Sequence, residues 1–302
     1  EGVHSVQFGS VFNMHKARGF CDLNIVFTTV EDTKQTVLKA AQLGYRTIAV
    51  NLEVTDESNS KQKKKKECEC PTPPSIVLTA EDLKRYNLRQ PPVILTRITI
   101  TYSDPGSRLI YKSKYKNLYD IMAYTPTTEN AMKQLCQPSA HDPDIISLDP
   151  NISECRYARK LIKSAIKKDT YFEISYSGCL GDTSVSRRNT IQLAQNLHQI
   201  ARSMNIIVTS RARHPSQLRA PYDVINLGRF FALTEAGAKE AILGHAQGVV
   251  HCASVRRTGL SKFHCSVANL QHTENLNNNK QKYEGLENPR KYLKKEELKV
   301  FD

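Results

Sequence analysis

The chain contains no tryptophan, and aromatic residues make up only 7% of its 302 residues. These few aromatics form no cluster that alternates with basic residues. The pattern argues against a module that stacks single-stranded RNA bases on aromatic side chains, such as an RRM or an OB fold. Hydrophobic runs are short, and none approaches the roughly 20 apolar residues that a membrane span requires. No secretory signal is recognisable, so we expect a soluble, intracellular protein with no membrane partner.

Patterns for metal binding and for nucleophilic catalysis are missing as well. The 8 cysteines include no CxxC pair, and the 9 histidines are never spaced two or four residues apart. Neither a zinc framework nor a redox dithiol is supported, and we expect reduced thiols. The sequence has no Gly-x-Ser-x-Gly elbow either. We therefore expect no catalytic residues, no metal and no cofactor on this chain.

Positive charge is what the chain has in excess. It carries 43 Lys+Arg against 30 Asp+Glu, a formal net charge of +13, and its pI is about 9.3. Such an excess favours a polyanionic partner, either nucleic acid or an anionic membrane surface. A basic face that is simply solvated is the alternative.

Apolar, β-branched segments recur at regular intervals and alternate with helical patterns. We expect eight strands, at residues 20–26, 47–52, 93–100, 118–123, 144–148, 171–176, 205–210 and 248–251. Eight strands alternating with helices over this length predict an α/β fold of the (β/α)8 TIM-barrel type. A doubly wound open sheet is the structural competitor, but it favours a glycine-rich phosphate turn, and none is present.

Helix ends can be assigned from capping patterns. We expect Asp32 to cap the first helix and Gly44 to end it. Thr79 and Asp82 form a capping-box pattern that predicts the start of another helix. Further helices are expected around residues 127–136, 155–167, 221–232 and 235–244, together with a long one after the sixth strand.

Polar segments divide the chain. The expected parts are an amino-terminal extension (1–19), a barrel domain (20–257) interrupted by a mobile insertion (53–78), and a polar tail (258–302) that is disordered or ordered by a partner. Met14 is a candidate start residue. The insertion carries a run of cations that is a candidate nuclear localisation signal or a solvated loop, formed by Lys61, Lys63, Lys64, Lys65 and Lys66.

Arginines follow three of the expected strands. The candidate RNA-binding residues are Arg187 and Arg188 after the sixth strand, Arg211 and Arg213 after the seventh, and Arg256 and Arg257 after the eighth. In a barrel these groups would project from one rim, where arginine can hold phosphates without reading base sequence. A solvated rim or contacts with an acidic partner protein are the alternatives.

Two further arginines are expected to play structural roles. Arg97 lies in mid-strand between apolar residues, so we expect it to point into the barrel and pair with Glu173 or Asp120. Arg219 precedes Pro221, which we expect to open a helix. An ion pair from Arg219 to Asp223, tying loop to helix, is as well supported as a functional role.

Carboxylates also follow several strands, where barrel enzymes hold acidic residues. They are Asp104, Asp149 and Asp182. The first two are followed by proline, a turn signature, and Asp182 can cap the next helix. We favour these structural roles over catalysis.

Five blocks resemble one family in order and together. They are Ala40–Tyr45, Ile94–Thr99, Leu118–Ile121, Phe172–Ser177 and Arg219–Gly228, and the resemblance spans roughly residues 20–257. They are similar to the TIM-barrel-like, thirty-kilodalton-class protein subunit of ribonuclease P and ribonuclease MRP from eukaryotes and archaea. The most specific block runs from Arg219 through Pro221 and Asp223 to Gly228.

The resemblance implies a non-catalytic subunit of an RNA-based endoribonuclease that removes the 5′ leader from precursor tRNA and also takes part in rRNA processing. It implies that the catalytic magnesium ions are held by the RNA subunit. The implied partners are the catalytic RNA, precursor tRNA indirectly, and small α/β protein subunits, usually in a symmetric assembly with two copies of each barrel. The implied location is the nucleus and nucleolus.

The family's barrel is related to PHP-type phosphoesterases, whose first strand carries a His-x-His metal pair. Asn24 and Val26 stand at the corresponding positions. Asparagine is a poor zinc ligand and valine is none. The missing pair speaks against a divergent metal-dependent phosphoesterase, which is kept as an alternative function. A protein-only scaffold without RNA contact is another alternative.

Overall fold

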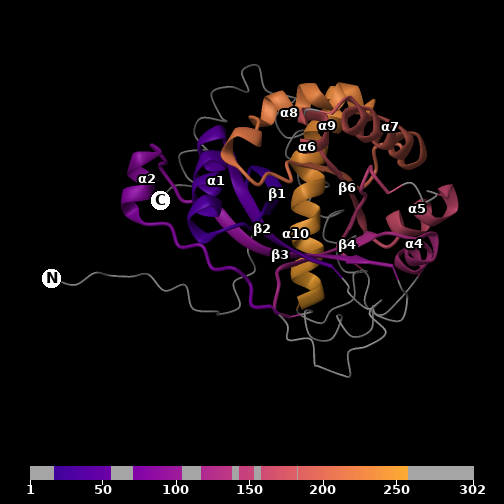
Figure 1. The fold of residues 1–302 in the computed structure, drawn as a ribbon, viewed down its shortest axis with the longest axis horizontal. Helices are drawn as coiled ribbons and strands as arrows, with labels where there is room; N and C mark the ends of the chain where they lie inside the picture. The colour runs from indigo at the N-terminus through magenta and orange to yellow at the C-terminus, as the bar shows by residue number, and fades with distance from the viewer. Residues whose placement is uncertain are drawn as a thin grey trace, which may run out of the picture.

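The computed structural model describes residues 17–55, 71–103, 117–137, 143–152, 158–181 and 183–257 (Figure 1). Several expectations fall outside these residues. They concern Met14, the lysine run at 61–66, Asp104, Asp182 and the tail after residue 257. Within the described residues, no helix has the length and apolar character needed to cross a bilayer.

Seven parallel strands form the central sheet in simple chain order. They are β1 (Phe20–Val26), β2 (Tyr45–Thr55), β3 (Val93–Tyr102), β4 (Ile121–Pro126), β5 (Ile145–Ser147), β6 (Tyr171–Ser175) and β7 (Ile206–Thr209). The sheet curls back on itself just after β7, where the N–H of Val26 donates to the carbonyl oxygen of Ala212 at 2.9 Å. Ile25 and Ala212 form a parallel bridge at the same place. The result is a nearly closed α/β barrel of the TIM type, with one strand fewer than expected.

The expected eighth strand at 248–251 is wrong, because these residues belong to helix α10 (Gly244–Arg257). Most of its buried residues recur at the three- and four-residue spacing of a helix, and the full set is Ala246, Gly248, Val249, Val250, Cys252, Ala253 and Arg256. The helix packs against side chains from the first halves of the strands, among them Leu23, Ile121 and Ile207. It therefore closes the amino-terminal end of the barrel.

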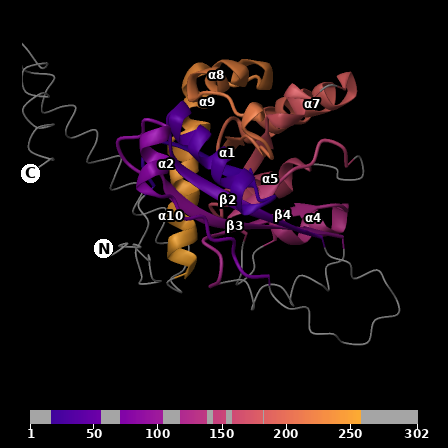
Figure 2. The same cartoon turned by 60° about the vertical axis from the view of Figure 1, so that its left-hand side comes forward.

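The remaining helices lie around the strands, with α1 and α2 on one side and α4 and α5 on the other (Figures 1 and 2). Their bounds are α1 (Val30–Leu43), α2 (Ala80–Arg85), α4 (Glu129–Cys136), α5 (Arg159–Ile166), α6 (Ser177–Leu180), α7 (Ser184–Ala201), α8 (Pro221–Leu227) and α9 (Glu235–Ile242). Two 3-10 turns, Pro215–Gln217 and Gly228–Phe231, flank α8. The predicted helix over 221–232 is thus an α-helix continued by a tighter turn.

The capping predictions are confirmed in part. Gly44 ends α1 in the left-handed conformation at φ 112°, and Thr79 with Asp82 forms a full capping box on α2. Asp32 is not the cap of α1. Thr29 holds that position, and its hydroxyl accepts a hydrogen bond from the N–H of Asp32 at 3.2 Å. The threonine lies three residues before the acid, which is the usual order of such a pair.

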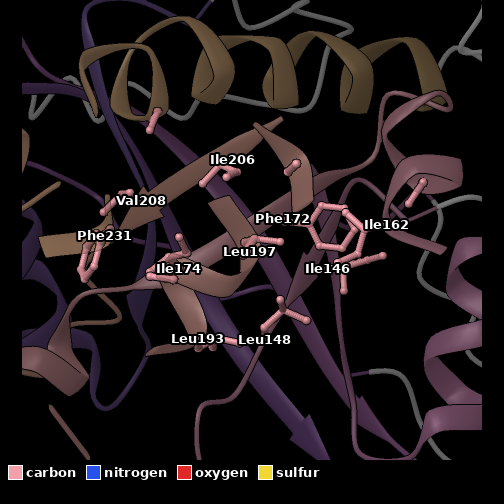
Figure 3. Packing of buried hydrophobic residues seen from close by; sticks show 14 of the residues in the cluster. Ile146, Leu148, Ile162, Phe172, Ile174, Leu193, Leu197, Ile206, Val208 and Phe231 are labelled. Carbon is pink, nitrogen blue, oxygen red and sulfur yellow. The ribbon is translucent and has the colours of Figure 1, made fainter. Parts of the chain in front are cut away.

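The main hydrophobic core lies between the strands and the outer helices (Figure 3). Leu193 and Leu197 of α7 lie in this cluster beside Phe172 and Ile174 of β6. The helical spacing of those two leucines predicts this buried face of α7. The buried residues of α7 lie between Thr190 and Ala201 and anchor that part of the helix. Its exposed first turns lie at the carboxyl-terminal end of the barrel, because the helix follows β6 with only the short α6 between them.

Candidate functional site

The interior of the barrel is occupied by a buried ion pair. Arg97 donates two parallel hydrogen bonds to Glu173, each 2.6 Å long, and both side chains are fully buried. The guanidinium also donates to the carbonyl oxygen of Leu23 at 2.8 Å. Burial alone would raise the pKa of Glu173, but the charge and hydrogen bonds of Arg97 hold that pKa below its ordinary value. The predicted pair of Arg97 with Glu173 is confirmed.

Amide side chains surround this pair. Asn24 of β1 donates to Glu173 at 3.2 Å and accepts from Asn51 of β2 at 2.8 Å. Thr99 and Thr209 donate to Asn51 and Glu173, respectively, at 2.8 Å each. The side chains of Asn24, Asn51, Thr99 and Thr209 therefore form one hydrogen-bonded network with the ion pair. Within the described residues, no group of three or more His, Cys, Asp or Glu comes together in a way that could hold a metal ion.

Asp22 lies in the same interior. One of its oxygens accepts from the N–H groups of Asn24 and Ser210, at 3.2 and 3.1 Å. The other oxygen is buried and has no hydrogen-bond partner among the described residues. Burial raises the pKa of Asp22 above its ordinary value. This carboxyl group links β1 to the residue that follows β7, at the seam where the barrel closes.

Two of the candidate RNA-binding arginines meet at the carboxyl-terminal end of the barrel. Arg211 Nε and Arg213 Nη2 each lie 2.8 Å from one oxygen of Glu53, near the end of β2. Asp149, after β5, lies 3.9 Å from Arg211. The pKa of Arg211 is raised, because the attraction of Glu53 outweighs burial. Glu53 was assigned to the insertion, which is wrong for residues 53–55 because β2 extends to Thr55.

An open pocket of about 340 Å³ lies beside these arginines. Its lining residues come from the ends of β5, β6 and β7, from α6 and the start of α7, and from the first 3-10 turn: Pro150, Asn151, Ser175, Ser177, Gly178, Ser186, Arg211, Arg213 and Gln217. Arg187 and Arg188 are exposed on α7, directly after Ser186. The structure therefore places the arginines after the sixth and seventh strands at the same end of the barrel.

The third pair, Arg256 and Arg257, lies at the opposite end. Arg256 is buried and pairs with Asp144, just before β5, at 3.0 Å. Arg257 pairs with Asp120, just before β4. The prediction that all three groups project from one rim is wrong for these two, because a helix that returns along the barrel replaces the expected eighth strand.

The loop between β7 and α8 is held by tyrosines. The N–H of Arg219 donates to the hydroxyl of Tyr176, and its carbonyl oxygen accepts from the hydroxyl of Tyr45, both at 3.1 Å. The Arg219 guanidinium donates to the carbonyl oxygens of Ser216 and Leu218 at 2.8 Å each. The sequence leaves an ion pair with Asp223 as one of two roles for Arg219; in the described residues its guanidinium contacts these carbonyl oxygens instead.

The rest of the motif has packing roles. Pro221 is the first residue of α8, as predicted. Gly228 faces α9, and a Cβ atom at this position would lie 2.6 Å from the Cβ of Ala238. The block from Arg219 to Gly228 therefore fixes the loop that follows β7 and the helix pair behind it.

Comparison with known proteins shows the family to which the chain is similar. The model of the RNase P subunit p30 family matches residues 19–258. Ribonuclease P protein subunit p30 of Mus musculus is 32% identical over 242 residues, covering 79% of this chain and 87% of the mouse protein. Probable ribonuclease P protein subunit 3 of Schizosaccharomyces pombe is 31% identical over 243 residues, covering 79% and 95%.

A solved structure shows the same fold. One chain of archaeal ribonuclease P with mature tRNA, determined by cryo-EM, superposes with a TM-score of 0.54 at 15% sequence identity. The match covers 77% of this chain and 90% of the archaeal chain.

Proposed function

The chain belongs to the RNase P subunit p30 family, and from this membership we propose that it supports the RNA of ribonuclease P without itself cleaving precursor tRNA. The observation that carries the non-catalytic role is the ion pair between Arg97 and Glu173. A fixed guanidinium occupies the barrel centre, and its charge opposes a divalent cation there. Its bidentate contact also uses both oxygens of the nearest buried carboxylate.

The carboxyl-terminal rim is the surface that we propose for RNA. Arg187 and Arg188 are exposed there, Arg213 is largely exposed, and Arg211 is partly exposed. Arginine binds phosphate oxygens through planar, bidentate contacts, which suits recognition of an RNA backbone without reading bases. Arg256 and Arg257 are engaged with Asp144 and Asp120 at the other end, so we assign them to stability.

The wider setting of the complex completes the proposal. We propose that magnesium ions for cleavage are held by the RNA, and that small α/β subunits share the assembly, with up to two copies of this chain. We propose a nuclear location, because relatives named as ribonuclease P subunits occur in the eukaryotes Mus musculus and Schizosaccharomyces pombe. Service in ribonuclease MRP, rRNA processing and a nucleolar location are the finer parts of the same proposal.

Purification from native cells tests this role. The tagged protein is isolated, and the eluate is assayed for 5′ cleavage of precursor tRNA before and after the co-purified RNA is digested. Activity that disappears with the RNA is expected. Metal-dependent phosphoesterase activity of the protein alone would overturn the non-catalytic role and support the divergent enzyme. RNA-free complexes that retain only protein partners would support the pure scaffold.

The RNA surface is tested by neutralising the rim. We expect Arg187→Ala, Arg211→Ala and Arg213→Ala together to reduce the slope of log affinity against log salt by about one for each lost phosphate contact. The matched control is Lys84→Ala, Arg85→Ala and Arg89→Ala, which removes three exposed cations on and after α2. A folded rim variant with the slope of the control would show that RNA binds elsewhere.

A further inference from the structure

The pocket at the carboxyl-terminal end of β5, β6 and β7 has an unusual lining. It combines two guanidinium groups with three serine hydroxyls and two side-chain amides, and its lining includes no carboxylate. Pro150 contributes the one bulky apolar side chain in this lining. Such a surface offers hydrogen-bond donors and positive charge but little for an apolar ligand to contact, so it suits a small, hydrated anion.

The backbone of Arg211 is held in place by the residues on either side of it. Its backbone has φ +51°, the left-handed region that non-glycine residues seldom adopt. Ser210 and Ala212 on either side are fully buried. The hydroxyl of Ser210 donates to the carbonyl oxygen of Asn24, and Ala212 is bonded to β1. The closure of the barrel thus fixes the direction in which Arg211 leaves the backbone.

Glu53 holds the two guanidinium groups without standing among the residues that line the pocket. It accepts one N–H from Arg211 and one from Arg213. A guanidinium has five N–H donors, so most of the donors on each arginine are not used by Glu53. The carboxylate therefore orders the pair. Asp149 lies 3.9 Å from Nη1 of Arg211, beyond hydrogen-bond distance, so N–H groups remain for a ligand in the pocket.

The size of the pocket limits what it can hold. About 340 Å³ is at the lower end of the range for small-molecule sites. It is enough for one phosphate with part of its ribose, whereas a duplex could touch only the rim. Arginine pairs and serine hydroxyls are both common phosphate ligands.

We propose that this pocket seats a single phosphate group of the RNA backbone, bound by Arg211 and Arg213 with the serine hydroxyls beside them, while Glu53 positions the two arginines. The proposal rests on the RNA-binding role proposed above and adds a defined seat to it. A pocket differs from a flat basic surface because a bulky neutral side chain can fill it and block the ligand without changing any charge.

Filling the pocket with a neutral side chain separates the two possibilities. Ser186 of α7 lines the pocket, whereas Ser184, two residues earlier on the same helix, is exposed and does not. We expect Ser186→Leu to weaken binding of the cognate RNA by about tenfold and to lower the salt slope by about one, although no charge is removed. Ser184→Leu is the control and should leave both quantities unchanged.

A second variant that fills the pocket controls for a structural disturbance around Ser186. Ser186 donates to the carbonyl oxygen of Gly178 at 3.3 Å, and its replacement could disturb α6. Asn151→Leu fills the pocket from the segment that follows β5, and it should reproduce the loss of affinity and slope. Inorganic phosphate added to the full chain should protect Arg211 from a guanidine-modifying reagent in wild type, and should fail to do so in both filled variants.

The outcomes distinguish this proposal from the one that it rests on. If the triple arginine variant lowers the slope but Ser186→Leu and Asn151→Leu behave like Ser184→Leu, RNA contacts the rim and the pocket proposal is wrong. If the triple variant itself leaves the slope unchanged, the rim is not the RNA surface and both fail. Glu53→Ala adds a check on positioning, since it removes a negative charge. Weaker binding supports an ordering role, and tighter binding overturns that part.

Discussion

At the level of single residues, the barrel interior shows how a buried charge can be stabilised although its desolvation costs free energy. A fully buried arginine loses its hydration, and that loss is offset only when a partner of opposite charge and good geometry is present. Arg97 has such a partner in Glu173, and the amides of Asn24 and Asn51 and nearby hydroxyls satisfy much of the remaining hydrogen-bonding capacity. Removing one member leaves the other buried without compensation.

Glu173→Gln tests this dependence. We expect it to lower the free energy of unfolding by about 3–5 kcal/mol at neutral pH, because Arg97 stays buried without a counter-ion. Urea unfolding measures the change. The control is Glu129→Gln, which breaks the exposed i,i+4 pair with Lys133 and removes the acid from the first turn of α4, and which should cost no more than about 1.5 kcal/mol.

The pH dependence of the Glu173 effect has a defined sign. The folded pKa of Glu173 is depressed, so its contribution is complete above the unfolded value of about 4.3 and is lost as pH falls through the folded pKa. The difference between wild type and Glu173→Gln should therefore shrink in acid. A difference that stays constant from neutral pH down to the acid limit would contradict this account.

The sequence predicts some of these residues and misses others for physical reasons. Arg97 is predictable because a charge in the middle of an apolar strand must find a partner. Glu53 is not, because a polar segment begins there and only the paired neighbours of β2 show that the strand continues. The role of Glu53 is to bind two arginines about 160 positions away in the chain, and no local sequence pattern predicts that contact.

At the level of elements, the prediction of a strand at 248–251 fails because the local sequence pattern is ambiguous. Val249 and Val250 form a short apolar run, and periodicity cannot assign so short a run to helix or strand. The wider spacing from Ala246 to Ala253 favours a helix, but Gly244 and Gly248 weaken that signal. Gly248 is required by packing, since a Cβ there would lie 2.4 Å from the hydroxyl of Tyr171.

The first turn of α5 breaks a rule that most helices obey. It begins with Arg159 and Lys160, its cap residue Ala158 offers no side-chain hydrogen bond, and no acid is present there. Cations at a helix amino terminus oppose the helix dipole. The helix N-terminus lies at the same end of the barrel as Arg187 and Arg211, so this local cost agrees with selection for an anionic partner.

Charge reversal on α5 separates stability from binding. We expect Lys160→Glu to raise stability of the free protein by about 0.3–1 kcal/mol, because an acid suits the first turn, and to weaken RNA binding. Lys163→Glu makes the same change of charge near the other end of the helix and should lower stability instead. Thermal unfolding and RNA titration measure the two effects. Equal shifts in melting temperature for both variants would contradict the dipole argument.

At the level of the whole molecule, the two ends of the barrel differ in how their arginines are used. At the amino-terminal end, Arg256 is buried against Asp144, and Arg257 contacts Asp120. At the carboxyl-terminal end, Arg213 is 60% exposed and shares one carboxylate with Arg211. Net charge of +13 alone does not distinguish these ends. The fold does, because it assigns one set to holding the last helix and leaves the other facing solvent.

Replacing one arginine at each end by methionine should therefore affect stability and RNA binding in opposite ways. Arg256→Met is expected to lower the free energy of unfolding by about 3 kcal/mol or more, since the buried carboxylate of Asp144 loses the opposite charge of the guanidinium beside it, and to leave the salt slope of RNA binding unchanged. Arg213→Met should lower the slope by about one and change stability by less than about 1 kcal/mol, because its pair with Glu53 is exposed. Fluorescence titration across a salt series, beside urea unfolding, measures both quantities. A lower slope for Arg256→Met, with the protein folded, would show that RNA also reaches the amino-terminal end, and the division of the barrel into a structural and a binding end would not hold.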